Sequence, residues 1–234
     1  MKRVEAIGSA LTDPSEDNTL SLNVVNPSPA IIESYSYEKL ERVKYLYESH
    51  YLPAVEKFFP DQLDVFIEVG VFEGDVSLYY SELFREVHGI EIDEKLCEKL
   101  EKRFLLQTKN NIKLHKGDSR DLLHKILEKV KEPALFWLDA HYAGPSTGGD
   151  PNYVPILEEL KAIRDWKQQC IVVMDDVNKF GQLLNQPDYP LSGYLAHRAD
   201  WTHINTQKIY DENNHYFNHS YWADQKRLVF IKND

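Results

Sequence analysis

Short apolar runs alternate with amphipathic stretches from about residue 63 to the C-terminus. Continuous apolar runs, such as those that lead into Asp139 and Asp175, are typical of strands buried on both faces of a sheet. The runs predict strands over residues 64–69, 86–92, 111–115, 134–139, 170–175, 203–210 and 227–232.

Between these runs, apolar residues recur at helical spacing. They predict helices over residues 76–84, 94–107, 120–130, 154–166 and around 192–198. Repeated strand–helix units favour a doubly wound α/β fold, in which a mostly parallel sheet carries helices on both faces. Since no helical pattern separates the last two strands, we expect them to form an antiparallel hairpin at the sheet edge.

The N-terminal part has a different pattern. Residues 1–34 are irregular in pattern, and residues 12–29 are rich in Asp, Asn, Ser and Pro. We expect an irregular arm that either is mobile, covers the site or wraps a partner subunit in a homo-oligomer. Residues 35–62 form an N-terminal helical segment, in which Pro53 is expected to break or kink the helix. Residues 63–234 then form the main domain.

Charge and composition limit the function classes. The net charge of −11 argues against a nucleic-acid backbone or an anionic membrane surface as the main partner. No stretch reaches the length of a membrane-spanning helix, and the N-terminus lacks the apolar core of a signal peptide. The two cysteines form neither a disulfide framework nor a zinc-ligand spacing. We therefore expect a cytoplasmic protein that binds neither nucleic acid nor membranes.

A glycine-bearing turn follows the first strand of the main domain. Gly70 permits a tight turn, and Gly74 permits a close approach of backbone to a ligand or of helix to strand. Phe72 stands where a dinucleotide fingerprint has its second glycine, which disfavours a nicotinamide-dependent oxidoreductase. Acidic Glu68 and Glu73 make the turn a poorer phosphate cradle.

Polar residues also follow the next two strands. Glu91 ends the second strand, where a carboxylate normally accepts both hydroxyl protons of a ribose. Asp118 follows the third strand and is a candidate acceptor for an adenine amino group, whereas Ser119 either caps the next helix or contacts the ring. Each residue alone is more often a cap or a turn residue, but the ordered set predicts a nucleoside-cofactor site.

Three acids follow the fourth and fifth strands. Asp139, Asp175 and Asp176 are expected at one edge of the sheet, where they would repel one another unless a cation lay between them. Mg²⁺ prefers such oxygen ligands. The alternative is that they cap a turn and a helix, as Asp often does.

The ordered set resembles the motifs of class I S-adenosylmethionine-dependent methyltransferases. Glu68 to Gly74 is similar to their first motif, Glu91 to their ribose acid, and Gly117-Asp118-Ser119 to their adenine-contacting turn. The resemblance implies a seven-stranded Rossmann-like sheet of order 3-2-1-4-5-7-6, a methyltransferase domain over residues 63–234, and S-adenosylmethionine as cofactor.

Asp139, Asp175 and Asp176 further resemble the metal ligands of metal-dependent O-methyltransferases, the group that includes the catechol, caffeoyl-coenzyme A and macrolide-sugar enzymes. The Asp-Asp pair is most similar to the sugar-methylating branch. The resemblance implies Mg²⁺-assisted methylation of a hydroxyl on a small molecule, such as a sugar or a glycosylated natural product. A base is also required, and His141 is the nearest one in sequence to Asp139; it either takes the proton or only orients Asp139 or substrate.

Other histidines and other functions stay open. Further candidates for the base are His197, His203, His215 and His219. A noncatalytic S-adenosylmethionine-binding subunit is the main alternative to an enzyme. A nucleic-acid methyltransferase is disfavoured by the negative charge and by the lack of an Asn-Pro-Pro-aromatic element after the fourth strand.

Overall fold

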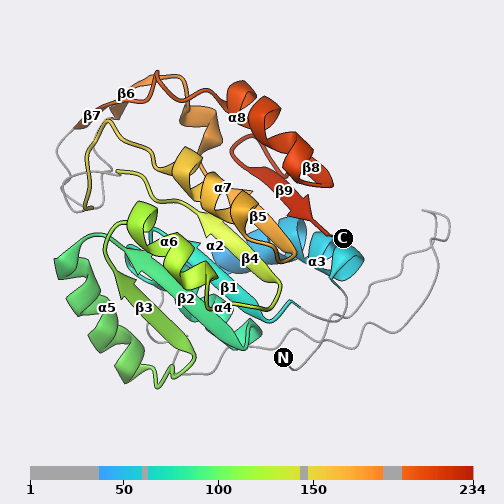
Figure 1. The fold of residues 1–234 in the computed structure, drawn as a ribbon. Coiled ribbons are helices and arrows are strands. Elements are labelled where there is room, and N and C mark those ends of the chain that lie inside the picture. The colour runs from blue at the N-terminus through green and yellow to red at the C-terminus, as the bar shows by residue number, and fades with distance from the viewer. Residues whose placement is uncertain (1–36, 60–62, 143–146, 187–196, 234) are drawn as a thin grey trace.

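The computed structural model describes residues 37–59, 63–142, 147–186 and 197–233, so the predicted arm over residues 1–34 lies outside the described residues. A seven-stranded sheet in the order β3-β2-β1-β4-β5-β9-β8 forms the centre of the protein (Figure 1). Numbered along the chain within this sheet, the strands have the order 3-2-1-4-5-7-6. The predicted doubly wound α/β fold is therefore confirmed.

Five parallel strands and an antiparallel edge make up this sheet. The parallel strands are β1 (Val65–Val69), β2 (Glu86–Glu91), β3 (Ile112–Lys116), β4 (Ala134–Leu138) and β5 (Cys170–Met174). The last strand, β9 (Leu228–Lys232), runs antiparallel to β5, and β8 (His219–Trp222) completes the expected edge hairpin. Every residue of β1, β4 and β5 is buried, as the continuous apolar runs of β4 and β5 predict.

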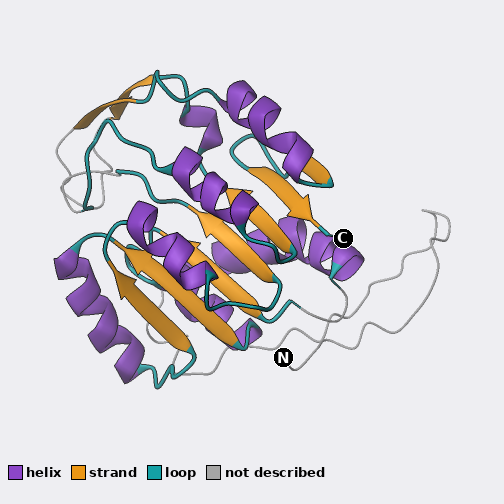
Figure 2. Cartoon of the chain, in the orientation of Figure 1, coloured by secondary structure: helices purple, strands orange, loops and turns teal. Residues whose placement is uncertain are grey.

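Helices cover both faces of the sheet (Figure 2). One face packs against α6 (Ser119–Leu127), α7 (Ile156–Asp165) and α8 (Thr206–Asn213). The other face packs against α2 (Tyr37–Leu46), the π-helical turn η1 (Tyr47–Tyr51), α3 (Leu52–Phe58), α4 (Asp75–Leu83) and α5 (Glu94–Leu106). Each face thus has its own apolar core.

The N-terminal helical segment is part of the second core. The break expected near Pro53 appears as η1, directly before α3. Pro53 lies in the first turn of α3, where the backbone N–H that proline lacks would have no partner within the helix. The fully buried Tyr51 ring lies edge-on to Trp137 of β4, with centroids 5.8 Å apart. The segment therefore closes over the sheet.

The prediction of a strand over residues 203–210 was wrong. These residues enter α8, because the Asn205 side chain accepts from the backbone N–H of Lys208 and caps the helix, while Ile209 packs into the core. The sixth strand of the main sheet is instead β8.

The helix predicted around residues 192–198 lies mostly outside the described residues. Its last two positions open β7 (His197–Asp200), which pairs antiparallel with β6 (Leu183–Gln186) in a separate two-stranded sheet. The short 3₁₀ turn η2 (Val177–Lys179) precedes β6, and a second one, η3 (Asn214–Tyr216), directly follows α8.

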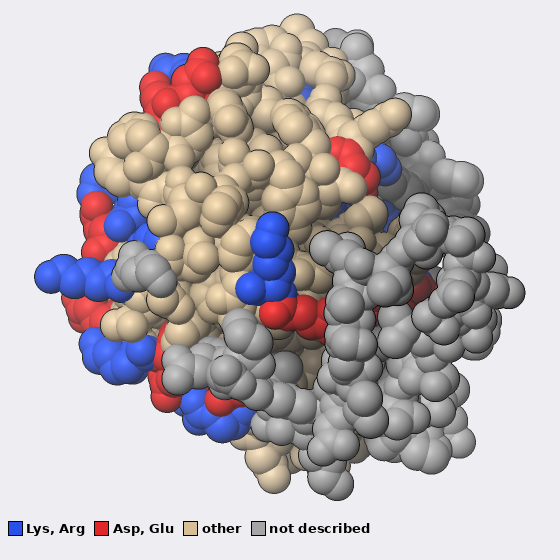
Figure 3. Space-filling model, turned by 90° about the vertical axis from the view of Figure 1, so that its right-hand side faces the viewer, with Lys and Arg blue, Asp and Glu red and all other residues tan. Residues whose placement is uncertain are grey.

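Charged residues of both signs lie close together at several places on the face in Figure 3, around broad uncharged areas. Among the described residues, no helix combines the length and apolar character needed to cross a bilayer.

A pair of stacked histidines joins β2 to β3. Nδ1 of His88 lies 2.9 Å from Nε2 of His115, and Nε2 of His88 lies 2.7 Å from Glu86 Oε1. Burial lowers the pKa of both histidines, that of His115 to about 4. The folded protein therefore favours the neutral forms.

Acid is expected to destabilise the fold through this pair. An unfolded histidine has a pKa of about 6.5. Between that pH and about 4, the unfolded chain binds more protons at His115 than the folded chain does, so the free energy of unfolding falls as the pH is lowered. Urea unfolding across this window should give a shallower pH dependence for His115→Gln than for the wild type. The exposed His203 provides a matched control, His203→Gln. Equal slopes for His115→Gln and the wild type would contradict the prediction.

Candidate functional site

The loops after β1, β4 and β5 are hydrogen-bonded to their neighbours at the carboxyl edge of the sheet. The backbone N–H of Asp139 donates to Val69 O at 2.9 Å, and that of Asp175 donates to Leu138 O at 3.0 Å. Gly70 has φ +88°, and a Cβ at this position would lie 2.5 Å from the carbonyl oxygen of Asp139. Only glycine allows the two loops to approach this closely.

Glu91 anchors the turn that holds Gly70. Its Oε2 accepts from the backbone N–H of Phe72 at 2.8 Å, and its Oε1 accepts from that of Asp93 at 2.9 Å. Phe72 has φ +51°, an uncommon backbone conformation that this contact helps to hold. A carboxylate has about four acceptor positions, so Glu91 retains capacity for two hydroxyl donors.

The other residues of the first motif have structural partners. Glu68 is buried and accepts a hydrogen bond from the Ser77 hydroxyl, and burial raises its pKa well above the ordinary value. Gly74 precedes α4 with φ +84°, and a Cβ there would lie 2.6 Å from a methyl group of Leu100. Both residues thus fix the position of α4 behind the turn.

Asp118 and Ser119 begin α6. Asp118 accepts from the backbone N–H of Arg120 at 2.9 Å and pairs with its guanidinium, so it acts as the helix cap. The Ser119 hydroxyl donates to Glu159 of α7 at 2.6 Å. Burial raises the pKa of Glu159 to about 8, although this hydrogen bond opposes the rise. Contacts of Asp118 and Ser119 with adenine stay a prediction.

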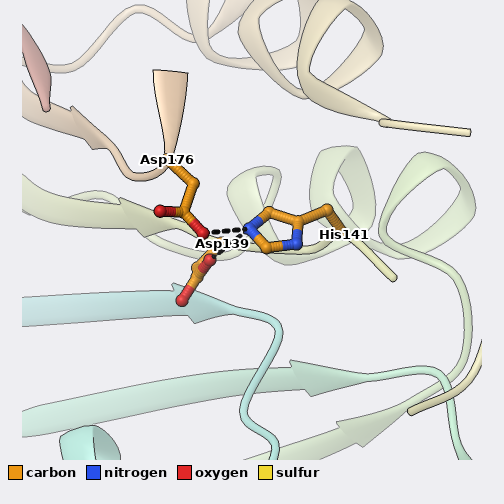
Figure 4. Close-up of side chains that lie close together, drawn as sticks. All are labelled: Asp139, His141 and Asp176. Carbon is orange, nitrogen blue, oxygen red and sulfur yellow. Dashed lines mark ion pairs between the residues drawn. The ribbon is translucent and has the colours of Figure 1, made fainter. Parts of the chain in front are cut away.

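Asp139, His141 and Asp176 converge after β4 and β5 (Figure 4). Nε2 of His141 lies 2.9 Å from Asp139 Oδ1 and 3.2 Å from Asp176 Oδ2. Lys179 Nζ lies 2.5 Å from the same Asp176 oxygen. One ligand atom from each of the three converging residues lies within 4.8 Å of the others, an arrangement that can hold a metal ion.

The charges in this cluster shift one another's pKa values. Burial alone would lower the pKa of His141, but Asp139 and Asp176 outweigh it and raise that pKa to about 10. Burial alone would raise the pKa of Asp176, but His141 and Lys179 hold it well below its ordinary value. These shifts favour a protonated His141 beside Asp176.

Asp175 points to a different partner. Nε of Arg227 lies 3.0 Å from Asp175 Oδ1, and Nη2 donates to Oδ2 at 3.3 Å. Arg227 is buried and also pairs with Asp224 at 2.5 Å. Burial raises the pKa of Asp175 to about 6, and Asp139 adds to the rise while Arg227 opposes it. The structure thus places His141, rather than Asp175, with Asp139 and Asp176.

Four contributors to this region received no role in the cluster from sequence: Glu159, Lys179, Trp201, which was considered only as one of several aromatic residues able to line an acceptor pocket, and Arg227. Glu159 had a detectable signal, because it occupies a core-facing position of a helix whose neighbours Ile156, Leu160 and Ile163 are apolar. Lys179 follows Asp176 by three residues, in the short turn η2 that the sequence did not predict. Trp201 and Arg227 come from segments distant from the motifs, where no local pattern marks a role.

A small cavity of about 10 Å³ lies beside the cluster, and its lining includes Asp139, His141, Glu159 and Asp175. That volume is about the size of one water molecule. A larger hollow of about 230 Å³ lies between α7 and α8, and its lining includes none of the predicted site residues.

Comparison with known proteins identifies the fold. No protein-family model and no curated protein matches the chain. The PH0226 protein from Pyrococcus horikoshii OT3 is similar in structure, with a TM-score of 0.55 at 15% identity over 88% of this chain and 95% of that chain.

Two further solved structures are less similar. An S-adenosylmethionine-dependent methyltransferase from Clostridium acetobutylicum ATCC 824 has a TM-score of 0.48 at 13% identity, over 86% of this chain and 93% of that chain. The N-terminal domain of EvdMO1 with SAH bound has a TM-score of 0.43 at 13% identity, over 85% of this chain and 81% of that chain.

Removing Arg227 is expected to be costly. Arg227→Met leaves the buried Asp175 carboxylate without its partner, which typically costs about 3–5 kcal/mol. Urea unfolding measures this loss, and the double variant Asp175→Asn, Arg227→Met should recover part of it because no buried charge remains. Arg85→Met is the matched control, since Arg85 forms an exposed pair with Glu132 worth at most about 1 kcal/mol. A loss for Arg227→Met no larger than that of the control would show that the pair does not stabilise the fold.

Proposed function

We propose that the protein is an S-adenosylmethionine-dependent O-methyltransferase that acts on a hydroxyl of a small molecule, such as a sugar or a glycosylated natural product. One observation carries the proposal: the Gly70 turn, Glu91 and the Asp139–His141–Asp176 cluster all lie at the carboxyl edge of one sheet. Doubly wound folds bind their ligands at this edge, where the strand order reverses beside the first strand.

The cofactor half of the site is formed by the loops after β1 and β2. Glu91 is held by two backbone N–H groups and has acceptor capacity for a ribose diol. Gly70 keeps the turn close to the loop that carries Asp139, so a cofactor bound at the turn reaches the cluster. The acceptor class follows from the resemblance of the Asp-Asp pair to the sugar-methylating branch.

Methyl transfer requires an in-line arrangement of three atoms. The acceptor oxygen forms a bond to the methyl carbon while the carbon–sulfur bond breaks, and the electron pair of that bond stays on sulfur. Alignment of the reacting atoms supplies much of the acceleration in such a reaction. The hydroxyl proton passes to a base.

A divalent cation fits beside Asp139 and Asp176. When bound there, such an ion lowers the pKa of an acceptor hydroxyl and orients its oxygen. Mg²⁺ is the ion that the family resemblance implies. The pKa of His141, about 10, means that this residue already carries a proton at neutral pH, so it acts as a base only after losing that proton.

Two alternatives differ in measurable ways. A noncatalytic binding subunit would bind S-adenosylmethionine without transferring its methyl group to any hydroxylated acceptor. A nicotinamide-dependent oxidoreductase would bind a dinucleotide at the same edge, although Phe72 occupies the position where that cofactor needs a glycine.

Glu91→Gln is expected to weaken S-adenosylmethionine binding about 5- to 150-fold, equivalent to about 1–3 kcal/mol. The amide retains the shape of the carboxylate but replaces one acceptor oxygen with a donor that faces a backbone N–H or a ribose hydroxyl. Isothermal titration calorimetry with S-adenosylmethionine measures the change, and NADH provides the test for the oxidoreductase.

The control is Glu98→Gln, which changes an exposed glutamate of α5. Unchanged affinity in Glu91→Gln would remove Glu91 from the cofactor site. Tight binding of NADH, with no binding of S-adenosylmethionine to the wild type, would overturn the proposed function. Transfer of radiolabelled methyl to a panel of sugars and glycosides would separate an enzyme from a binding subunit.

A further inference from the structure

The cluster after β4 and β5 has a donor set that differs from the three acids predicted from sequence. Asp139 and Asp176 each offer a carboxylate oxygen, and His141 offers an imidazole nitrogen. Both carboxylate oxygens of Asp175 instead contact the guanidinium of Arg227. We infer that Asp139, His141 and Asp176 form a mixed nitrogen–oxygen site that selects a transition-metal ion of the Mn²⁺-to-Zn²⁺ series over Mg²⁺. The inference rests on the proposed function only for the expectation that a cation assists transfer.

The spacing of the donor atoms suits such an ion. Two metal–ligand bonds of about 2.1 Å at a right angle place their donor atoms about 3.0 Å apart. The distances from His141 Nε2 to the two carboxylate oxygens are 2.9 and 3.2 Å. The three side chains come from the ends of two adjacent, buried strands, so their backbone positions are fixed by the sheet.

His141 supplies a second, independent observation that points to an ion at this site. Its side chain is 9% exposed. Nδ1 has no hydrogen-bond partner among the described residues, and Nε2 lies close to both carboxylates without hydrogen-bond geometry to either. A buried nitrogen that faces two carboxylates without a well-formed hydrogen bond to either is uncommon, and an ion between the three groups would account for it. The ring points its Nε2 between the two carboxylates (Figure 4).

Trp201 holds the His141 ring in this orientation. The two rings meet edge to face with centroids 4.9 Å apart. Trp201 is itself fully buried, and its Nε1–H donates to Pro151 O at 3.0 Å. The imidazole is therefore positioned for a ligand before any ion binds, as a preformed metal site requires.

The imidazole decides the class of ion. Mg²⁺ takes oxygen ligands almost exclusively, whereas Mn²⁺, Co²⁺ and Zn²⁺ accept imidazole nitrogen. The affinity of such sites generally rises from Mn²⁺ through Co²⁺ to Cu²⁺ and falls again at Zn²⁺. If a cation binds Nε2, His141 acts as a metal ligand and does not act as the general base that was predicted from sequence.

Lys179 limits the affinity of the site. Its ammonium lies 2.5 Å from the Asp176 oxygen that also faces His141, so a divalent ion on that oxygen is repelled by it. Removing this charge should strengthen ion binding.

Isothermal titration of the metal-free protein with MnCl₂, ZnCl₂ and MgCl₂, without cofactor or acceptor, tests the inference. Transition ions bind most nitrogen and oxygen sites more tightly than Mg²⁺ does. The ratio of the Mg²⁺ to the Zn²⁺ dissociation constant in the wild type alone therefore does not show that His141 is a ligand. The diagnostic comparison is His141→Gln, which replaces the nitrogen donor by an oxygen of similar reach. The ratio of the Mg²⁺ to the Zn²⁺ dissociation constant should fall at least tenfold in this variant.

Lys179→Met should bind Mn²⁺ at least threefold more tightly than the wild type, a gain that a misfolded variant would not show. Asp165→Asn, which changes an exposed acid of α7, is the control and should leave all three affinities unchanged. An unchanged Mg²⁺-to-Zn²⁺ ratio in His141→Gln, or no binding of any ion to the wild type and Lys179→Met, would overturn the inference.

These outcomes are independent of the proposed function. Binding of S-adenosylmethionine without any ion binding would refute the metal site and leave the proposed methyl transfer standing. Ion binding with the expected selectivity, but no binding of S-adenosylmethionine, would refute the proposed function and leave the site in place.

Discussion

The buried ion pair between Asp175 and Arg227 allows three carboxylates to lie at one edge of the sheet. Their mutual repulsion would be severe in a partly buried region, since charges interact more strongly where water is excluded. Arg227 neutralises Asp175, while His141 and Lys179 contact the other two acids. The expectation that a bound cation must hold the acids together therefore needs revision: the chain's own cations provide much of that charge. A metal ion bound by Asp139, His141 and Asp176 then competes with Lys179 for Asp176 and replaces the proton on His141, rather than filling an uncompensated site.

The antiparallel edge of the sheet explains how Arg227 reaches this position. A strand that runs opposite to its neighbour begins where the neighbour ends, so the residue before β9 lies beside the residue after β5. Arg227 also pairs with Asp224. Oδ2 of Asp224 lies 3.7 Å from Nε2 of His50 in the N-terminal helical segment. The Tyr221 hydroxyl also donates to His50 O at 2.9 Å. The hairpin and the helical segment therefore brace the acid cluster from the side away from α7.

The sequence predicted what depends on local pattern. Apolar runs located the parallel strands, and the order of Gly70, Glu91 and Asp139 along the chain placed them at one edge, because parallel strands share that edge. The local sequence pattern did not predict features that tertiary contacts determine. Residues 203–210 alternate enough to suggest a strand, but the Asn205 cap and the burial of Ile209 favour a helix. The Asp175–Arg227 pair joins positions 52 residues apart, and no local spacing signals such a contact.

Two physically different halves thus meet at the carboxyl edge. The half proposed for the cofactor depends on neutral backbone groups, since Glu91 is held by the N–H groups of Phe72 and Asp93. The half proposed for the acceptor depends on ion pairs among side chains that follow β4 and β5 or precede β9. Backbone hydrogen bonds to Glu91 persist at high salt, whereas the more exposed charge contacts, such as that of Lys179, are screened. Salt should therefore alter ion binding at His141 more than nucleoside binding at Glu91, because only the ion site includes a competing ammonium group.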